Sequence, residues 1–202
     1  MQKLLVATTS KGKLGEIKDI LGDLPLKLLM LREVKLPKDF FVLETGSTFA
    51  ENACLKAQSY GKASGLLTLA DDSGLCVDAL GGKPGLFTSR YAPGSDQDRW
   101  QKLLKELGDL PLSRRTAQFV ATVALYDPGS QKTVVKEGRC FGHIAFGPKG
   151  KHGFGYDPVF MVDKLGKHFA QLTRKEKNQV SHRAVAVKKI KPILAKLLKH
   201  ET

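Results

Sequence analysis

The chain of 202 residues is long enough for one well-buried core or for two lobes, and its composition of 42% hydrophobic and 26% charged residues is that of a soluble globular protein without a membrane span. The formal net charge of +13 suits a polyanionic partner, either nucleic acid or a small phosphate ester, although a lysine-rich helix face in solvent also explains it. Three widely spaced cysteines without a CxxC pair argue against a disulfide framework and a zinc knuckle. The N-terminus soon turns polar and shows no secretory pattern. We therefore expect a cytoplasmic protein.

The first part of the chain is predicted to begin with a strand followed by two helices. The strand covers residues 3–8, and the first helix runs from about Lys11 to Leu21, before the Gly and Pro of "GDLP". The second helix lies within 45–65, where Thr48 and Glu51 have the spacing of a capping box and a glycine ends the helix.

The middle of the chain is predicted to hold strands, a long loop and a helix. Residues 66–80 favour a strand, a corner and a second strand, and the Gly/Pro-punctuated loop over 81–94 is too long to be a mere connection. Ser95 follows as the cap of a helix whose apolar residues recur at helical spacing, namely Trp100, Leu103, Leu104 and Leu107.

The last part of the chain is predicted to contain a pair of long strands and a terminal helix. The strands cover 116–127 and 132–146, a glycine-rich stretch leads to a short strand near Phe160, and a helix from about Arg174 is disturbed at Pro192. The pattern predicts an α/β protein whose sheet is mixed rather than purely parallel, in a single domain over 1–202 without a separable linker.

The corner "ATTSKGKLGEI", residues 7–17, joins the first strand to the first helix. A helix N-terminus presents unpaired backbone N–H groups and a partial positive charge, and both attract phosphate oxygens. Hydroxyl, glycine and lysine residues surround it: Thr8, Thr9, Ser10, Gly12 and Lys13. The Walker pattern is absent. The alternative is that Ser10 merely caps the helix and that the lysines are solvated.

Two adjacent carboxylates, Asp71 and Asp72 in "LADDSGL", are expected at the end of an apolar strand. Without a cation, one of them would tend to take up a proton. Mg²⁺ removes this conflict, because it binds through one or two carboxylates and substrate phosphates. The alternative is a pair of turn-forming residues that closes a hairpin. Glu44, at another strand-to-helix corner, offers a further carboxylate.

Two further motifs suit recognition of a nucleobase. "HGFGYDPVF" combines glycines with Phe154, Tyr156 and Asp157, so an aromatic face is available for stacking and a carboxylate or amide for the base edge. "SHR", residues 181–183, lies on a basic helix and offers donors to a purine or to phosphates. The alternatives are a hydrophobic corner for the first motif and an exposed surface for the second.

Five fragments, in order along the chain, resemble one known family. They are "ATTSKGKLGEI", "ETGSTFAENACLKA", "ADDSGLCVDALGGKPGLFTSRYA", "GFGYDPVF" and "LTRKEKNQVSHRAVA". Together they are similar to the inosine/xanthosine triphosphate pyrophosphatases, and the similarity extends from about residue 4 to 195.

The resemblance implies an elongated α/β fold with a mixed central sheet and flanking helices, two lobes around a substrate cleft, and a homodimer. It implies an Mg²⁺-dependent enzyme that hydrolyses ITP, dITP and XTP to the nucleoside monophosphate and pyrophosphate, with no need for a membrane or nucleic acid.

The resemblance also assigns roles to individual residues. Glu44 and Asp72 would bind Mg²⁺, and Asp72 would in addition accept the proton of the attacking water. The triphosphate would be held by Thr8, Thr9, Ser10, Lys11, Gly12, Lys13 and Lys56, with Ser73 also touching substrate. The base pocket would consist of Phe154, Gly155, Tyr156, Asp157, Lys177, His182 and Arg183.

The sequence departs from the family pattern at two positions. Ser10 stands where the family usually has Asn, which puts the strength of one phosphate contact in doubt, whereas Lys175 replaces a second acid beside Glu176 and reads as surface variation. Two alternatives stay open. One is a Maf-like pyrophosphatase acting on pyrimidine or modified nucleotides, which the "GFGYD" and "SHR" motifs disfavour. The other is a nucleic-acid-binding module, for which no reader motif is found.

Overall fold

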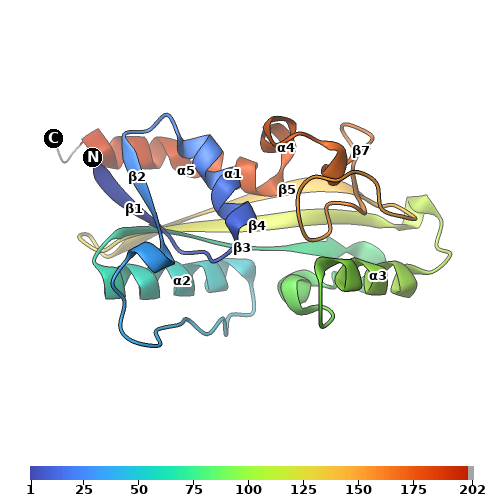
Figure 1. Ribbon diagram of the computed structural model, residues 1–202, viewed down its shortest axis with the longest axis horizontal. Helices are drawn as coiled ribbons and strands as arrows, with labels where there is room; N and C mark the ends of the chain where they lie inside the picture. Colours follow the sequence, from blue (N-terminus) through green and yellow to red (C-terminus); the bar gives the residue numbers. More distant parts are fainter. Residues whose placement is uncertain (200–202) are drawn as a thin grey trace. The chain divides into compact units, whose positions relative to one another are not determined.

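A computed structural model describes residues 1–199 and shows a mixed α/β fold (Figure 1). Its seven-stranded sheet has the order β2-β1-β3-β4-β5-β6-β7. The strands are β1 (Gln2–Val6), β2 (Leu26–Met30), β3 (Leu67–Val77), β4 (Thr116–Asp127), β5 (Lys132–Ile144), β6 (Phe160–Val162) and β7 (Lys167–His168). The α-helices are α1 (Lys11–Leu21), α2 (Phe49–Ser64), α3 (Asp96–Leu107), α4 (Arg174–Val180) and α5 (His182–Lys199). None of the helices in this part of the chain is long and apolar enough to cross a membrane.

The sheet is mixed, as predicted. β1 pairs in parallel with both β2 and β3, whereas β6 pairs antiparallel with both β5 and β7. The predicted long strand pair is confirmed as β4 and β5, and their short connection makes them antiparallel.

The chain divides into two compact units, each built from separate segments. Unit 1 contains 1–72, 121–138 and the chain from Arg183 onward, and unit 2 contains 73–120 and 139–182. The chain passes from one unit to the other inside β3, β4 and β5 and where α5 begins. Neither unit is therefore a continuous piece of sequence.

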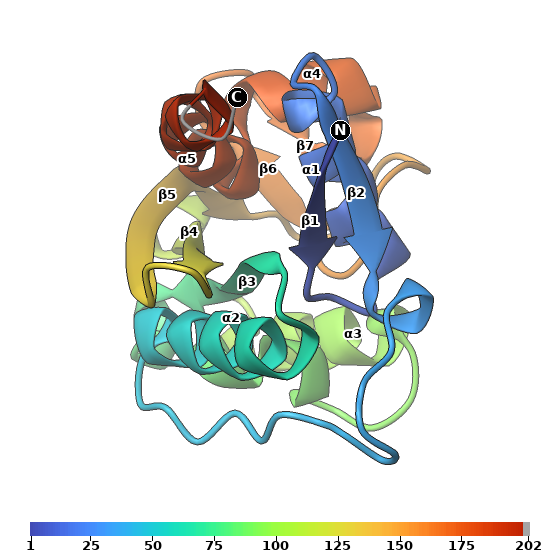
Figure 2. The ribbon, with the colours of Figure 1, turned by 90° about the vertical axis from the view of Figure 1, so that its left-hand side faces the viewer.

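In unit 1, helices cover both faces of the sheet. Leu67 and Leu69 of β3 pack in the cluster that includes α1 and α5, whereas Ala70 packs with α2, because successive strand residues point to opposite faces. Figure 2 shows α2 and α5 on opposite sides of β3. This division of faces decides where each side chain of the following acidic pair points.

In unit 2, one apolar cluster joins α3 to the strands and to an aromatic group. The rings of Phe119, Phe160 and Phe169 contact one another, with centroids 4.8 to 5.8 Å apart. The ring of His182 stacks on Phe119 at 4.7 Å. The core of this unit therefore extends to the first residue of α5.

Four local predictions were wrong. Residues 67–77 form one continuous strand, so Asp71 and Asp72 lie inside β3 and not at a strand end. What ends just before them is the pairing of β3 with β1, whose last residue pair is Val6 and Leu69. The terminal helix is interrupted at Ser181, which is extended and whose N–H donates to Lys177 O, while Pro192 lies within a continuing helix. β2 was not predicted. Thr48 caps α2 as predicted, because its hydroxyl accepts from Glu51 N at 3.1 Å, but the Glu51 carboxylate accepts from Ser47 N and does not complete a capping box with Thr48. The predicted terminal helix reaches residues 200–202, which lie outside the described residues.

Candidate active site

The corner after β1 presents the N-terminus of α1. Ala7 N donates to Leu69 O at 2.8 Å, which fixes the chain where it leaves the sheet. Ser10 caps the helix, because its hydroxyl accepts from Lys13 N at 3.3 Å, and the Thr8 hydroxyl accepts from Ser10 N at 3.2 Å. Capping by Ser10 was the alternative to a phosphate role, but it leaves the other N–H groups of the first turn without an intrahelical acceptor. The corner therefore keeps donors for an anion.

A buried ion cluster lies next to this corner in unit 1. Lys13 Nζ is 2.5 Å from Asp71 Oδ1, and Arg183 Nε donates to Asp71 Oδ2 at 3.0 Å. Arg183 also donates to the buried carboxylate of Glu16 in α1. Burial alone would raise the pKa of Asp71, but Arg183 and Lys13 outweigh it and hold the pKa well below its usual range. Asp71 is therefore an ionised structural partner of these two cations.

Asp72 belongs to a second charge group, around Lys56 of α2. Lys56 Nζ is 2.7 Å from Glu44 Oε1 and 3.0 Å from Asp72 Oδ1. Burial raises the pKa of Asp72, with Glu44 adding to the rise and Lys56 opposing it. A carboxylate with a raised pKa is a better proton acceptor than an ordinary one.

The strand geometry explains why the two aspartates differ. Consecutive residues of β3 point to opposite faces, so Asp71 meets α1 and α5 while Asp72 meets α2. Asp71 is enclosed by two cations, and Asp72 shares one lysine with Glu44. Asp72 and Glu44 are therefore the acids of this group that are not enclosed between two cations.

Glu44 and Asp72 suit a hard divalent cation. Both place a carboxylate oxygen within 3.0 Å of the Lys56 ammonium nitrogen, so their side chains converge on one cationic group. Mg²⁺ binds through one or two carboxylates completed by substrate phosphates and water, and this donor set fits that requirement. No cluster of three or more His, Cys, Asp or Glu side chains suited to a metal is found within residues 1–199.

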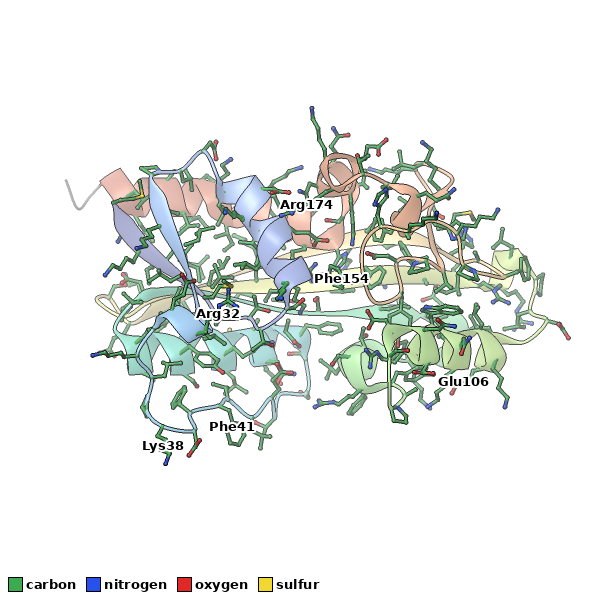
Figure 3. The ribbon with its side chains drawn as sticks, in the orientation of Figure 1. Arg32, Lys38, Phe41, Glu106, Phe154 and Arg174 are labelled. Carbon is green, nitrogen blue, oxygen red and sulfur yellow. The ribbon has the colours of Figure 1, made fainter. Side chains whose placement is uncertain are left out.

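The expectation that Glu44 lies at a strand-to-helix corner was wrong, because no strand lies in the described residues between Met30 and α2. Glu44 lies in an irregular segment whose end is held by the first turns of α2. Buried Asn52 accepts from Gly46 N at 2.7 Å, and Glu51 accepts from Ser47 N at 2.6 Å. A Cβ at residue 46 would lie 2.6 Å from the Cβ of Glu51, so only glycine fits this approach. By contrast, Phe41, three residues before Glu44, is 75% exposed (Figure 3). The fixed corner, rather than the preceding segment, orients Glu44.

The loop 153–157 in unit 2 is closed on itself by a buried carboxylate. Asp157 accepts from Phe154 N at 2.9 Å and pairs with Lys177 Nζ at 2.5 Å. The Lys177 ammonium also lies 4.7 Å from the centre of the Phe154 ring. Gly153 has φ +81°, and a Cβ there would lie 2.0 Å from Asp157 Oδ2. Lys177 and Asp157 thus organise the loop that presents Phe154.

The structure groups the predicted site residues by unit. Unit 1 contains the phosphate corner, Glu44, Lys56, Asp72 and Arg183, and unit 2 contains Ser73, the 154–157 loop, Lys177 and His182. Arg183 is engaged by Asp71 and Glu16, and His182 is buried against Phe119; their roles in base binding stay predictions.

Sequence analysis missed Glu16, Asn52 and Asp96, which hold predicted site elements in place. Each looked like an ordinary helix residue, since Glu16 and Asn52 lie within helices and Asp96 follows a Ser cap. The partners of Glu16 and Asp96 are distant in sequence, so local pattern carries no signal for them, whereas Asn52 accepts from Gly46 N only six residues away.

Comparison with known proteins gives the family. The model of the Ham1 family matches residues 4–193. The chain belongs to the Ham1 family. It is 46% identical over 195 residues to the dITP/XTP pyrophosphatase of Prochlorococcus marinus (strain NATL1A), covering 96% of this chain and 95% of the relative. It is 42% identical over 196 residues to the dITP/XTP pyrophosphatase of Bacillus subtilis (strain 168), covering 96% of this chain and 98% of the relative.

Solved structures of Ham1 proteins have the same fold as this Ham1 chain. A HAM1 protein from Coxiella burnetii matches with a TM-score of 0.86 and 39% identity, covering 97% of this chain and all of that one. The Staphylococcus aureus Ham1 protein matches with a TM-score of 0.82 and 41% identity, with both chains fully covered. The family predicted from the sequence motifs is thus confirmed.

Proposed function

We propose that this chain hydrolyses noncanonical purine nucleoside triphosphates (ITP, dITP and XTP) to the monophosphate and pyrophosphate. The observation that carries the proposal is the charge group on α2, where Glu44, Lys56 and Asp72 converge. The Ham1 relatives named dITP/XTP pyrophosphatase support the same activity.

The triphosphate is bound by the N-terminus of α1. Phosphate oxygens accept hydrogen bonds from the first-turn N–H groups, and the helix dipole adds attraction for the negative charge. Lys11 is exposed at this end, and Lys13 lies one turn inside, oriented by Asp71. Lys56 supplies a further cation. These groups neutralise charge that grows on the phosphate oxygens in the transition state.

Glu44 and Asp72 would hold the Mg²⁺ ion. When bound, the ion neutralises phosphate charge as a Lewis acid and helps to orient the triphosphate. Asp72 takes the proton of the attacking water, since its carboxylate shares one lysine with Glu44 and is not enclosed between two cations. Asp71 cannot share the task, since Lys13 and Arg183 engage both of its oxygens.

The 6-substituent of the base separates hypoxanthine and xanthine from adenine, whereas guanine, also a 6-oxopurine, differs from them at its 2-amino group. Hypoxanthine and xanthine carry a 6-oxo acceptor, whereas the 6-amino group of adenine would present a donor to the donors of the site. Backbone N–H groups of Phe154 and Gly155 already donate to carboxylates, so the 6-oxo readout falls to side chains such as His182. A site built on hydrogen bonds penalises a mismatched partner heavily.

A product assay tests the proposal. The protein is incubated with Mg²⁺ and separately with ITP, XTP, dUTP, GTP or ATP, and pyrophosphate and orthophosphate are measured. We expect pyrophosphate from ITP and XTP and little product from the others. Orthophosphate release, or no turnover together with tight oligonucleotide binding, would contradict the proposal.

We further propose that the chain acts as a single domain, as a homodimer and in the cytoplasm. The chain passes four times between the two units, which supports a single domain, since cutting the chain at any one of these points would not separate the two units.

Exposed Phe87, Phe141 and Phe146 of unit 2 give apolar surface suited to a second copy. Three free cysteines suit a reducing compartment. Sedimentation at two concentrations tests the dimer: a monomer at both would contradict it.

A further inference from the structure

We propose that Asp96, the first residue of α3, is a positioning residue that holds the loop 153–157 for binding of the purine base. The inference rests on the proposed function, because it concerns how that substrate's base is bound. Asp96 belongs to none of the motifs that indicated the activity. All the contacts that support it lie within unit 2.

The Asp96 carboxylate is fixed at both of its oxygens. Oδ2 accepts from Gly155 N at 2.7 Å, across 59 residues of sequence, and Oδ1 accepts from Arg99 Nη2 at 2.6 Å. Arg99 in turn donates to Gly94 O at 3.1 Å. Partial burial works to raise the pKa of Asp96, but Arg99 and the Gly155 amide outweigh it and lower the pKa. The acceptor for Gly155 is therefore charged and pre-oriented.

The loop needs a hydrogen bond of this kind at Gly155 to hold its backbone. This residue has φ +62°, and nothing lies within 4 Å of the place where a Cβ would be, so side-chain packing does not hold the backbone there. Glycine also has more conformational freedom than any other residue. The hydrogen bond to Asp96 thus adds, at Gly155, a contact from another element to the bonds that Asp157 makes with Phe154 within the loop.

A second fastening comes from the segment 81–94, whose length had no explanation in the sequence. The Tyr156 hydroxyl donates to Thr88 O at 3.1 Å. The Thr88 hydroxyl accepts from Leu75 N in β3 at 2.9 Å and donates to Gly85 O at 2.6 Å. This segment and the start of α3 therefore form the support on which the loop rests.

The support affects binding of the base and not the chemical step. Phe154 is the ring assigned to base stacking; the Lys177 ammonium lies over this ring, and Asp157 pairs with Lys177 and accepts from the Phe154 backbone N–H. The groups assigned to the triphosphate and to the water are other residues, in unit 1. Loosening the loop should therefore weaken nucleotide binding while turnover of bound substrate continues.

The test uses the full chain and three variants. Asp96→Ala removes the acceptor, and Asp96→Asn keeps an acceptor oxygen for Gly155. Asp98→Ala is the matched control, because Asp98 caps the same helix through Ser95 N at 2.7 Å without touching the loop. For each variant, kcat and KM for ITP are measured, together with the Kd for inosine monophosphate by calorimetry and the Tm.

For Asp96→Ala, we expect KM for ITP and Kd for inosine monophosphate to rise about tenfold, the loss expected for a charge-assisted hydrogen bond, with kcat within about twofold. Asp96→Asn should keep both constants within about threefold, since a neutral acceptor retains part of the bond. Asp98→Ala should lower the Tm and leave both constants unchanged.

Three results would overturn the inference: unchanged constants in Asp96→Ala, an equal rise in Asp98→Ala, or an Asp96→Asn variant as impaired as Asp96→Ala. The first would show that Gly155 needs no fastening, the second that the helix cap matters, and the third that charge acts alone. If the unaltered chain releases no pyrophosphate from ITP, the proposed function fails instead.

Discussion

Replacing Arg183 by Met should destabilise the protein strongly, because it removes a cation from a buried ion cluster. Arg183 is 2% exposed and pairs with Asp71 and Glu16, both buried. Methionine fills a similar volume, so the main loss is electrostatic: two buried carboxylates are left with Lys13 as the nearby cation. Removing one partner of a buried ion pair costs about 3–5 kcal/mol, a large share of an ordinary stability of about 5–15 kcal/mol.

The expected loss corresponds to a fall in Tm of about 6–20 °C, since 1 kcal/mol shifts the Tm of a protein of this size by about 2–4 °C. Urea denaturation followed by circular dichroism measures the free energy of unfolding. Arg114→Met is the control, since Arg114 is exposed and its loss should cost less than about 0.5 kcal/mol. The double variant Arg183→Met/Glu16→Gln should recover part of the loss, because it removes the excess buried charge.

The same comparison has a pH dependence of known sign. The pKa of Asp71 is lowered in the folded state, so its contribution to stability is complete above the unfolded pKa of about 3.9 and is lost as the pH falls below it. In Arg183→Met, an excess buried carboxylate takes up a proton more readily, which favours the folded variant at low pH. The difference in unfolding free energy should therefore shrink from pH 7 toward pH 4. A loss below 1 kcal/mol at pH 7, or a difference that grows on acidification, would refute the reasoning.

Three further substitutions test the candidate site. Asp72→Asn should lower kcat for ITP at least about 100-fold, because it removes the proton acceptor, while the far-UV spectrum and Tm are kept. Ser10→Asn should lower KM for ITP, or leave it unchanged if Thr9 or Lys11 compensates, since Asn adds NH₂ donors. Gly46→Ala should cost about 1–3 kcal/mol and raise the Mg²⁺ concentration needed for half-maximal rate, because the new Cβ would lie 2.6 Å from Glu51 Cβ and displace the Glu44 corner.

Each of these substitutions has an outcome that contradicts it. Full activity in Asp72→Asn would remove Asp72 from the proton and metal roles, and a large rise of KM in Ser10→Asn would mean that the phosphate corner is misassigned. For Gly46→Ala, the control is Gly147→Ala, where a Cβ meets nothing within 4 Å. Equal effects of the two alanines would show that the Gly46 approach is unimportant.

Much of the fold followed from local pattern. The helices at Lys11 and Phe49, the strand pair 116–127 and 132–144, and the Ser95 cap were predictable because periodicity and capping depend on neighbours in sequence. The continuity of β3 was not predictable. Gly74 and two acids in a row read as a corner, and only strand pairing carries the chain straight through them.

The break at Ser181 shows the same limit. Nothing in "NQVSHR" interrupts a helical pattern, whereas Pro192 does, yet α5 continues through the proline and the chain turns at Ser181. His182, the residue after the break, is buried, and its ring stacks on Phe119. This contact depends on tertiary packing, so local propensity carries no information about it.

The sequence by itself indicated candidate residues for the chemistry: the corner at the start of α1, two acids in "ADDS" and the aromatic loop are short motifs whose residue types point to a nucleotide. Only the tertiary structure decided what each member does. Asp71 and Asp72 are neighbours of one type, and the alternation of β3 gives the first to Lys13 and Arg183 and the second to Lys56. Asp96 likewise meets its partner Gly155 only in the folded chain, because 59 residues separate the two in sequence. The reason is that partners far apart in sequence meet only once the elements have packed.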